Sequence, residues 1–361
     1  MEIKIVKNLD SGAISNTYIA NYGKEKVILK IGHVLLEESS DAISILEQFD
    51  EVARKLPNHL LTCKSISIIP KCDLKHVKPE NFRSKSNSWY AKLHNSDKCL
   101  QTIYTPILEN NLLNLINNQF SAMDAKIVNK LIKNNINPDS IKVEIAEYRH
   151  NAVCVLVQIF YIYDFMFKNN WVHADLHIKN IMYRRTTAKS IPIILGKNKI
   201  NLKMGSLKTQ IYFIDYDLMY KRTGEYDKTI IGKYIDYVKT RNNQHFILME
   251  NVIYFIRRPE KYLNVNKLYT ILANNPTTKA LRKYIPKAIL EEPETAELCL
   301  FALSVILETE TFLELIGYKN DELLVKATKS TQIFTEKDII FIVRNLCNPA
   351  TVIKYFVKMI N

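Results

Sequence analysis

The sequence predicts an α+β fold with two lobes, a small β-rich lobe over residues 1–105 and a larger, mostly helical lobe over residues 106–361. Two features of the apolar pattern lead to this prediction. Up to about residue 105, apolar and polar residues alternate in short runs, which is typical of half-buried strands. From residue 109 onward, apolar residues recur every three or four positions, as on one face of a helix. A chain of 361 residues is also long enough to bury two such cores.

The same pattern places the individual elements. In the first lobe we expect strands at 2–6, 17–21, 26–31 and 65–69 and a helix at 40–56. In the second lobe we expect helices at 110–119, 142–168, 244–257, 296–316 and 336–360. Short strands at 180–183, 191–195, 199–202 and 210–214 interrupt these helices, with turns at Gly196 and Gly205. A short hinge over residues 103–107 is expected to join the lobes.

The charge balance points to acidic or phosphate-bearing partners without identifying one. The chain has 50 Lys and Arg against 37 Asp and Glu, a surplus of 13 positive charges. Because the charges are scattered along the chain, a generally lysine-rich surface is an equally good explanation. No recognition helix, zinc finger or interleaving of basic and aromatic residues is evident, so nucleic-acid binding is not expected as the main role.

The cysteines and the apolar stretches favour an intracellular protein without a membrane span. The six cysteines lie far apart and form no C-x-x-C pair, so we expect reduced thiols and no structural zinc. The N-terminal residues lack the apolar core of a signal peptide. The most apolar stretch, 152–168, is interrupted by Gln158 and Asp164.

Residues 173–180, which read HADLHIKN, have the spacing of a phosphoryl-transfer loop. An apolar helix precedes them and a short strand follows, which is the setting that such a loop requires. Asp175 is expected to orient and deprotonate an acceptor hydroxyl, and Asn180 to bind Mg²⁺ through its amide oxygen. His173 is expected to brace the loop by hydrogen-bonding the backbone.

Two further residues extend this set. Asp215 follows the apolar run 211–214 and is expected to be a second Mg²⁺ ligand rather than an ordinary turn residue. Lys30 follows the apolar run 27–29 and is expected to reach the phosphates of a nucleotide. A buried lysine needs a carboxylate partner, and the helix at 40–56 offers Glu47 and Glu51, one turn apart. We favour Glu51, with Glu47 as the alternative.

Residues 9–20 lie between two predicted strands and are expected to cover the phosphates. They contain Gly12, flanked by Ser11, Ala13 and Ser15, whose small side chains let backbone amides approach phosphate oxygens.

Taken together, these residues resemble the eukaryotic-type protein kinase superfamily over residues 8–220. Within it the chain is most similar to haspin and related kinases of large DNA viruses, because Asp175-Leu176-His177 and Asp215-Tyr216 match that group. The haspin-like group also has a β-hairpin between the catalytic loop and the metal aspartate. The interval from Asp175 to Asp215, with its two glycine turns, looks similar.

The resemblance implies a bilobal kinase fold and a Ser/Thr protein kinase that uses ATP and Mg²⁺. It implies that Asp175 is the base, that Lys30 binds phosphate and that His177 approaches the transferred phosphate. Tyr104 and Thr105, in the hinge, would contact the nucleotide. The substrate is a protein of unknown identity, and the location is the host cytoplasm or nucleus, with packaging in a virion as a further alternative.

Some positions depart from the family pattern. Asp10 and Ser15 stand where glycines are common, Asp217 replaces the glycine that usually follows the metal aspartate, and no Ala-Pro-Glu closes the activation segment. Two alternatives therefore stay open. The first is a small-molecule kinase of the aminoglycoside or choline type, which shares the His-x-Asp-x-x-x-x-Asn spacing. The second is a pseudokinase that keeps the fold and serves as a scaffold.

Overall fold

The computed structural model describes residues 3–11, 15–33, 39–70, 98–134, 138–173, 176, 180–216, 219–221, 341, 344–345 and 348–360. They fall into two compact units. One contains the described residues within Met1–Leu108, Asn169–Ala174 and Ile214–Ile253, and the other those within Glu109–Lys168, Asp175–Phe213 and Tyr254–Asn361. The chain is α+β, with a sheet-rich N-terminal region and helices later, as predicted. The predicted helices at 244–257 and 296–316 lie outside the described residues.

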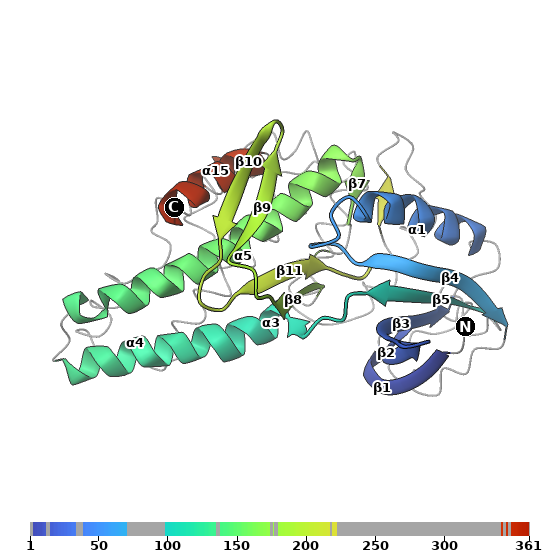
Figure 1. Cartoon of the computed structure of the whole chain (residues 1–361), viewed down its shortest axis with the longest axis horizontal. Helices are drawn as coiled ribbons and strands as arrows, with labels where there is room; N and C mark the ends of the chain where they lie inside the picture. The colour runs from blue at the N-terminus through green and yellow to red at the C-terminus, as the bar shows by residue number, and fades with distance from the viewer. Residues whose placement is uncertain are drawn as a thin grey trace, which may run out of the picture. The chain divides into compact units, whose positions relative to one another are not determined.

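The first unit is built on a five-stranded antiparallel sheet with strand order β1-β2-β3-β5-β4 (Figure 1). Four strands lie close to the predicted ones: β1 (Ile3–Ser11), β2 (Ser15–Tyr22), β3 (Glu25–His33) and β4 (Thr62–Pro70). The fifth strand, β5 (Lys98–Thr105), was not predicted and takes up part of the expected hinge. Gly23, at φ 62°, allows the two-residue turn between β2 and β3.

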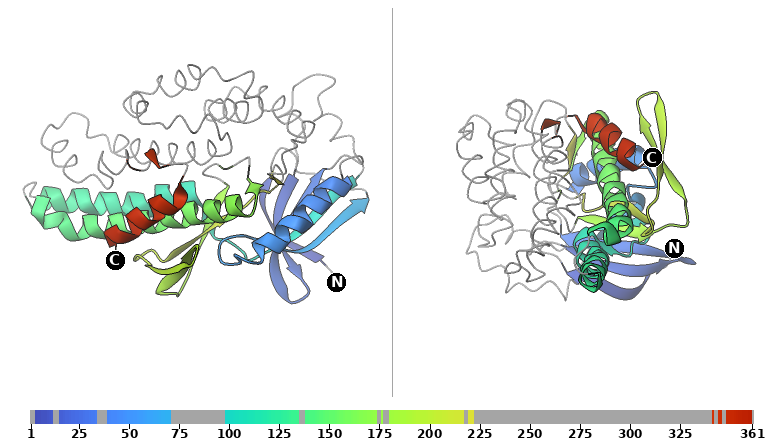
Figure 2. Two further views of the ribbon diagram at one scale, coloured as in Figure 1. Left: turned by 90° about the horizontal axis from the view of Figure 1, so that it is seen from above. Right: turned by 90° about the vertical axis from the view of Figure 1, so that its left-hand side faces the viewer.

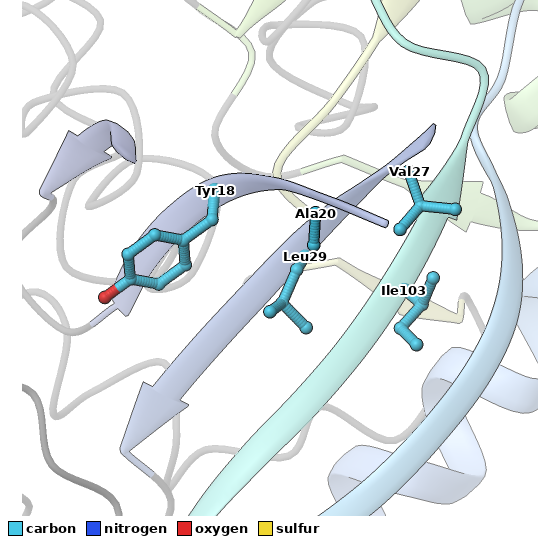
Figure 3. Packing of buried hydrophobic residues seen from close by; sticks show 5 residues of the cluster. All are labelled: Tyr18, Ala20, Val27, Leu29 and Ile103. Carbon is cyan, nitrogen blue, oxygen red and sulfur yellow. The ribbon is translucent and has the colours of Figure 1, made fainter. Parts of the chain in front are cut away.

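One face of this sheet carries an apolar cluster made of direct cross-strand partners. Tyr18 on β2 lies opposite Leu29 on β3, and Leu29 lies opposite Ile103 on β5; Ala20 and Val27 form a second pair. Figure 3 shows these five side chains, each at most 7% exposed. Because alternate side chains of a strand point to opposite faces, the next residue along β3, Lys30, lies on the other face of the sheet.

Helix α1 (Ser39–Ala53) also belongs to the first unit and buries Leu46, Phe49 and Ala53, which are spaced along one face. Its Asp50 accepts hydrogen bonds from the backbone N–H of Cys63, at 2.5 Å, and from Nε of Arg54, at 2.7 Å. Asp50 thereby ties the helix to the start of β4. No local pattern identifies this role, because the bonded N–H belongs to Cys63, 13 residues further along the chain.

The second unit is organised around the 27-residue helix α5 (Lys142–Lys168), whose bounds agree with the predicted ones. Helix α15 (Pro349–Ile360) packs against α5, and Figure 2 shows it alongside that helix. Helix α4 (Ser121–Lys133) was not predicted; it follows α3 (Leu112–Leu115) and the π-helical turn Ile116–Phe120. A three-stranded sheet has the order β11-β8-β6, from β11 (Thr209–Phe213), β8 (Ile181–Arg185) and β6 (Asn110–Asn111).

Gln158 on α5 completes the hydrogen bonding of β11, whose strand neighbour is β8 on one side alone among the described residues. Its side-chain Nε2 donates to the carbonyl of Thr209 at 3.0 Å, and its Oε1 accepts from the backbone N–H of Ile211 at 3.0 Å. Gln158 is fully buried and therefore takes the place that a further strand would occupy. The polar residue that interrupts an apolar helix is a structural link between that helix and the sheet.

Strands β9 (Ser190–Leu195) and β10 (Asn198–Lys203) form the hairpin that the sequence predicted, with Gly196 at φ 63° in its turn. Helix α5 holds the base of this hairpin, because His150 Nε2 and Cys154 Sγ each lie 3.0 Å from the carbonyl oxygen of Lys203.

Asn151, on the same helix, binds the segment that follows the hairpin. It accepts from the N–H of Leu207 and donates to Oγ of Ser206, both at 3.0 Å. A Cβ at Gly205 would lie 2.2 Å from Oδ1 of Asn151, so only glycine fits there.

The segment Asp139–Lys168 is the one helix among the described residues that is long and apolar enough to cross a membrane, and 83% of its apolar window is buried inside the protein. Gln158 and Asn151, which lie in it, are bound to the strands and loops described above.

The cysteines differ from the prediction at one position. Cys63 and Cys154 are buried free thiols, and burial raises their pKa to about 11 and to about 12. Cys99 is disulfide-bonded, and its partner lies outside the described residues. The prediction that all six cysteines are reduced is therefore wrong for Cys99.

The link between α5 and β11 can be tested by Gln158→Leu, which keeps the side-chain volume and removes its hydrogen bonds. The substitution leaves a buried N–H and a buried carbonyl without this partner, so the free energy of unfolding should fall by about 2–4 kcal/mol. Urea unfolding followed by circular dichroism measures it. Gln48→Leu, at an exposed position of α1, is the control and should change stability by less than about 0.5 kcal/mol. Equal effects of the two variants would contradict the role of Gln158.

Candidate active site

The candidate site in the first unit is centred on an ion pair between Lys30 and Asp215. Nζ of Lys30 donates to Oδ1 of Asp215 at 2.6 Å, and the two side chains are 13% and 38% exposed. Lys30 lies within β3, on the face opposite the apolar cluster, and Asp215 follows the end of β11. The structure therefore brings together two of the predicted site residues, 185 positions apart in the chain.

Asp215 is held in an uncommon backbone conformation. Its φ is 67°, in the left-handed region, where aspartate is one of the few non-glycine residues that recurs. Such a conformation costs on the order of 1 kcal/mol and persists when the neighbouring residues fix the chain. Hydrogen bonds hold the residues on both sides of Asp215.

His173 fixes the residue before Asp215. Its Nε2 lies 2.8 Å from the carbonyl oxygen of Ile214, and the ring is buried. Burial lowers the pKa of His173 to about 4, so the ring is neutral near pH 7 and its N–H donates to that carbonyl. The predicted role of His173 as a backbone brace is confirmed.

Tyr216, the residue after Asp215, is held in place by its own side chain. Its hydroxyl oxygen accepts from the backbone N–H of Leu61 at 3.0 Å, and burial raises its pKa well above the ordinary value of 10. The ring is 3% exposed and lies against Phe49 of α1 and Tyr104 of β5, with centroid distances of 4.6 and 6.2 Å. The sequence marked Tyr216 as a feature of a kinase group; its anchoring role depends on Leu61, which no motif identifies.

Both ends of the HADLHIKN loop are described. At its start, His173 follows β7 (Trp171–Val172), which pairs with β12 (Tyr220–Lys221), and binds Ile214. At its end, the buried Asn180 precedes Ile181, which pairs with Phe213. The loop therefore starts at a residue that binds the carbonyl of Ile214, and it is followed by a strand that pairs with β11. Asp175 and His177, within the loop, and Asp217 lie outside the described residues.

The predicted pair between Lys30 and Glu51 is not formed. Among the described residues, neither Glu51 nor the alternative Glu47 makes an ion pair with Lys30, and both side chains are exposed. The physical reason is the face that α1 buries: Leu46, Phe49 and Ala53 point inward, which turns Glu47 and Glu51 outward. Asp215 provides the carboxylate instead.

The remaining predicted nucleotide contacts lie at strand ends. Ser11 ends β1, Ser15 begins β2 and is buried, and Gly12 and Ala13 lie outside the described residues. Tyr104 and Thr105 end β5, where Oγ1 of Thr105 lies 3.3 Å from Oγ1 of Thr62.

The described residues contain no group of three or more His, Cys, Asp or Glu side chains that could hold a metal ion by itself. Mg²⁺ does not require one, since it binds proteins through one or two carboxylates and takes further oxygens from phosphates and water. Asp215, with a partly exposed carboxylate, and Asn180, with an amide oxygen, are donors of the type that Mg²⁺ prefers. The residues present therefore fit a magnesium–nucleotide complex.

No protein-family model matches the chain, and no curated protein matches it.

The buried neutral histidine predicts a loss of stability in acid. The pKa of His173 is about 4 in the folded chain and near 6.5 when unfolded, so protonation favours the unfolded chain as the pH falls from about 6.5 to about 4. Between about pH 7.5 and about pH 5 this group should cost about 2 kcal/mol. In His173→Gln that share of the pH dependence should disappear from urea unfolding curves.

The exposed His150 offers a matched control for this measurement, because His150→Gln should keep most of the wild-type pH dependence. An unchanged pH dependence in His173→Gln would contradict the neutral, buried state of His173.

Tyr216→Phe tests the anchor on the other side of Asp215. The phenylalanine ring can keep the aromatic contacts, but the buried N–H of Leu61 loses its acceptor. The free energy of unfolding should therefore fall by about 1–2 kcal/mol. A thermal or urea unfolding curve measures this, and unchanged or increased stability would show that the hydroxyl anchors nothing.

Proposed function

We propose that this chain is a phosphotransferase that uses ATP and Mg²⁺ and transfers the γ-phosphate to Ser or Thr hydroxyls of proteins. One observation carries the proposal. Lys30 and Asp215 form an ion pair, and His173, at the start of the loop that contains Asp175, binds the carbonyl of Ile214, the residue before Asp215. These are the parts that phosphoryl transfer requires: a phosphate-binding cation, a metal-binding carboxylate and a residue that receives the acceptor's proton.

Lys30 is suited to bind phosphate. It lies on the third strand of the chain, as the phosphate-binding lysine of protein kinases does, and its side chain is only 13% exposed. A charge removed from water in this way interacts strongly with an opposite charge. In the absence of nucleotide Asp215 supplies that charge, and we expect phosphate oxygens to share Lys30 when nucleotide binds.

Asp215 and Asn180 are the proposed metal ligands. Bound Mg²⁺ would neutralise the charge of the phosphates and align them for transfer. The left-handed backbone of Asp215, fixed through His173 and Tyr216, keeps its carboxylate from rotating away with the chain. Asn180 immediately precedes β8, which pairs with β11, the strand that leads to Asp215.

Asp175 is the proposed base. The loop that carries it starts at His173, which binds Ile214, and ends at Asn180, one residue before the partner of Phe213. By its position in the HADLHIKN spacing, Asp175 is the carboxylate that would orient a substrate hydroxyl and accept its proton.

The direct test is transfer of radiolabelled phosphate from ATP, in the presence of Mg²⁺, to the chain itself or to a set of proteins. Lys30→Ala and Asp175→Ala should each lower the rate at least about 100-fold, because each removes a group that acts on the transferred phosphate or its acceptor. Lys26→Ala, an exposed lysine four residues earlier on the same strand, is the matched control and should keep the wild-type rate.

Three outcomes would contradict the proposal. Transfer that persists unchanged in Asp175→Ala would remove the base. Transfer to an aminoglycoside or choline, with no protein labelled, would make the chain a small-molecule kinase. No transfer and no nucleotide-induced rise in melting temperature would indicate a scaffold, since a ligand that binds the folded chain must stabilise it.

A further inference from the structure

One segment of the second unit concentrates positive charge. Taken over the whole chain the basic residues are scattered, but residues 181–214 contain seven basic residues and no Asp or Glu, against a surplus of 13 for the chain. The segment therefore holds more than half of that surplus. It consists of β8, the β9–β10 hairpin and β11.

Five of the seven side chains are exposed lysines that pair with no acidic residue in the part of the chain that the structure describes. Arg184 lies over the ring of Tyr212, 5.3 Å from its centroid, and Arg185 pairs with Glu109. The others form no ion pair among the described residues: Lys189, Lys197, Lys199, Lys203 and Lys208. We call these five the hairpin lysines: four lie on the β9–β10 hairpin or directly before it, and Lys208 lies between the hairpin and β11.

The hairpin presents one face to solvent. Along β9 exposed and buried residues alternate, with Ile191, Ile193 and Leu195 buried and the residues between them exposed. The solvent face therefore carries Ile194, which is 55% exposed, opposite Lys199, and Ser190 opposite Lys203. Figure 1 shows the hairpin standing out from α5 with its turn at the far end.

The two strands differ as possible partners for a further strand. Pro192 lies in β9, and proline has no N–H to donate. β10 contains no proline, and β9 is its one strand neighbour among the described residues; at its end, the carbonyl of Lys203 is bound by His150 and Cys154 of α5. Lys199 and Lys203 lie four residues apart on β10, about 13 Å along the strand, and edge lysines disfavour pairing with neutral or basic strands.

We propose that the solvent face and the β10 edge of this hairpin bind an extended acidic segment of a partner protein. Such a segment, with carboxylates at alternate positions, repeats a charge about every 7 Å on one face, which suits Lys199 and Lys203. Added strands commonly bind exposed edges through the backbone and are selected by their alternate side chains. Ile194 offers an apolar contact for a residue between the carboxylates.

Other polyanions fit less well. Single-stranded nucleic acid is usually bound with exposed aromatic side chains, but Tyr183, Tyr212 and Phe213, the only aromatic residues of 181–214, are buried. A membrane surface favours several apolar side chains next to basic ones, whereas Ile194 is the one large apolar side chain of this segment that is strongly exposed. The lysines follow the length of the hairpin, as an extended chain would.

The acidic segment would belong to the protein that this chain phosphorylates, and in that one respect the inference rests on the proposed function. Binding itself requires no phosphotransfer. If the hairpin fails to bind while transfer occurs, only this inference fails; if it binds while transfer is absent, only the proposed function fails.

Fluorescence anisotropy measures the binding of a labelled peptide in which glutamate and valine alternate. The peptide is long enough to span the six residues of β10 and contains no hydroxyl residues. Lys197→Glu/Lys199→Glu/Lys203→Glu should weaken binding at least about tenfold. The matched control changes the same net charge in the other unit, at exposed lysines without ion pairs among the described residues: Lys4→Glu/Lys7→Glu/Lys24→Glu. This control should bind as the wild type does.

Three further probes identify the occupant: the same peptide with glutamine in place of glutamate, a uridine homopolymer, and vesicles of phosphatidylserine and phosphatidylcholine. The proposal expects no binding of the glutamine peptide, and a glutamate-peptide affinity that falls with added salt. Equal binding by the hairpin variant would overturn the proposal. So would RNA or vesicles that bind the wild type more tightly than the acidic peptide and are lost in the hairpin variant.

Discussion

The candidate site depends on the constraint placed on a single stretch of backbone, residues 213–216. Each residue in it makes a contact with a residue far away in the sequence. Its first residue pairs with a neighbouring strand, the carbonyl of its second binds a histidine, the carboxylate of its third binds a lysine, and the hydroxyl of its last accepts from a backbone N–H. These contacts are Phe213 with Ile181, Ile214 with His173, Asp215 with Lys30 and Tyr216 with Leu61. The left-handed backbone conformation of Asp215 is maintained because the residues on both sides of it are held by these contacts.

This constraint explains which parts of the site could be predicted from sequence. Lys30 and Asp215 were identifiable because each follows an apolar run that lies in a strand, and such runs are local features of the sequence. His173 was correctly interpreted because a histidine at such a position commonly bonds the backbone. The partner of Lys30 was not predictable in this way. Local spacing offered Glu51, whereas the observed partner lies 185 residues away and depends on how α1 turns its apolar face.

In the fold, too, elements set by local sequence patterns were predicted, and those that depend on distant contacts were missed. Helix α5 was predicted at its observed bounds, and the β9–β10 hairpin with its Gly196 turn was predicted within one residue at each strand end. Strand β5 was missed because its role comes from pairing with β3 and β4 and its residues lack clear alternation. Gln158 was interpreted only as a break in an apolar helix, although it completes the hydrogen bonding of β11.

We propose that Lys30 and Asp215 form a site for a magnesium–nucleotide complex, and calorimetric titration with ATP measures that binding. The wild-type chain should bind ATP more tightly with Mg²⁺ than without it. Asp215→Asn should lose at least about tenfold of the affinity measured with Mg²⁺ and most of its dependence on the metal. An Asp215→Asn chain that binds ATP with unchanged affinity and unchanged Mg²⁺ dependence, or a wild-type chain that binds no nucleotide, would contradict it.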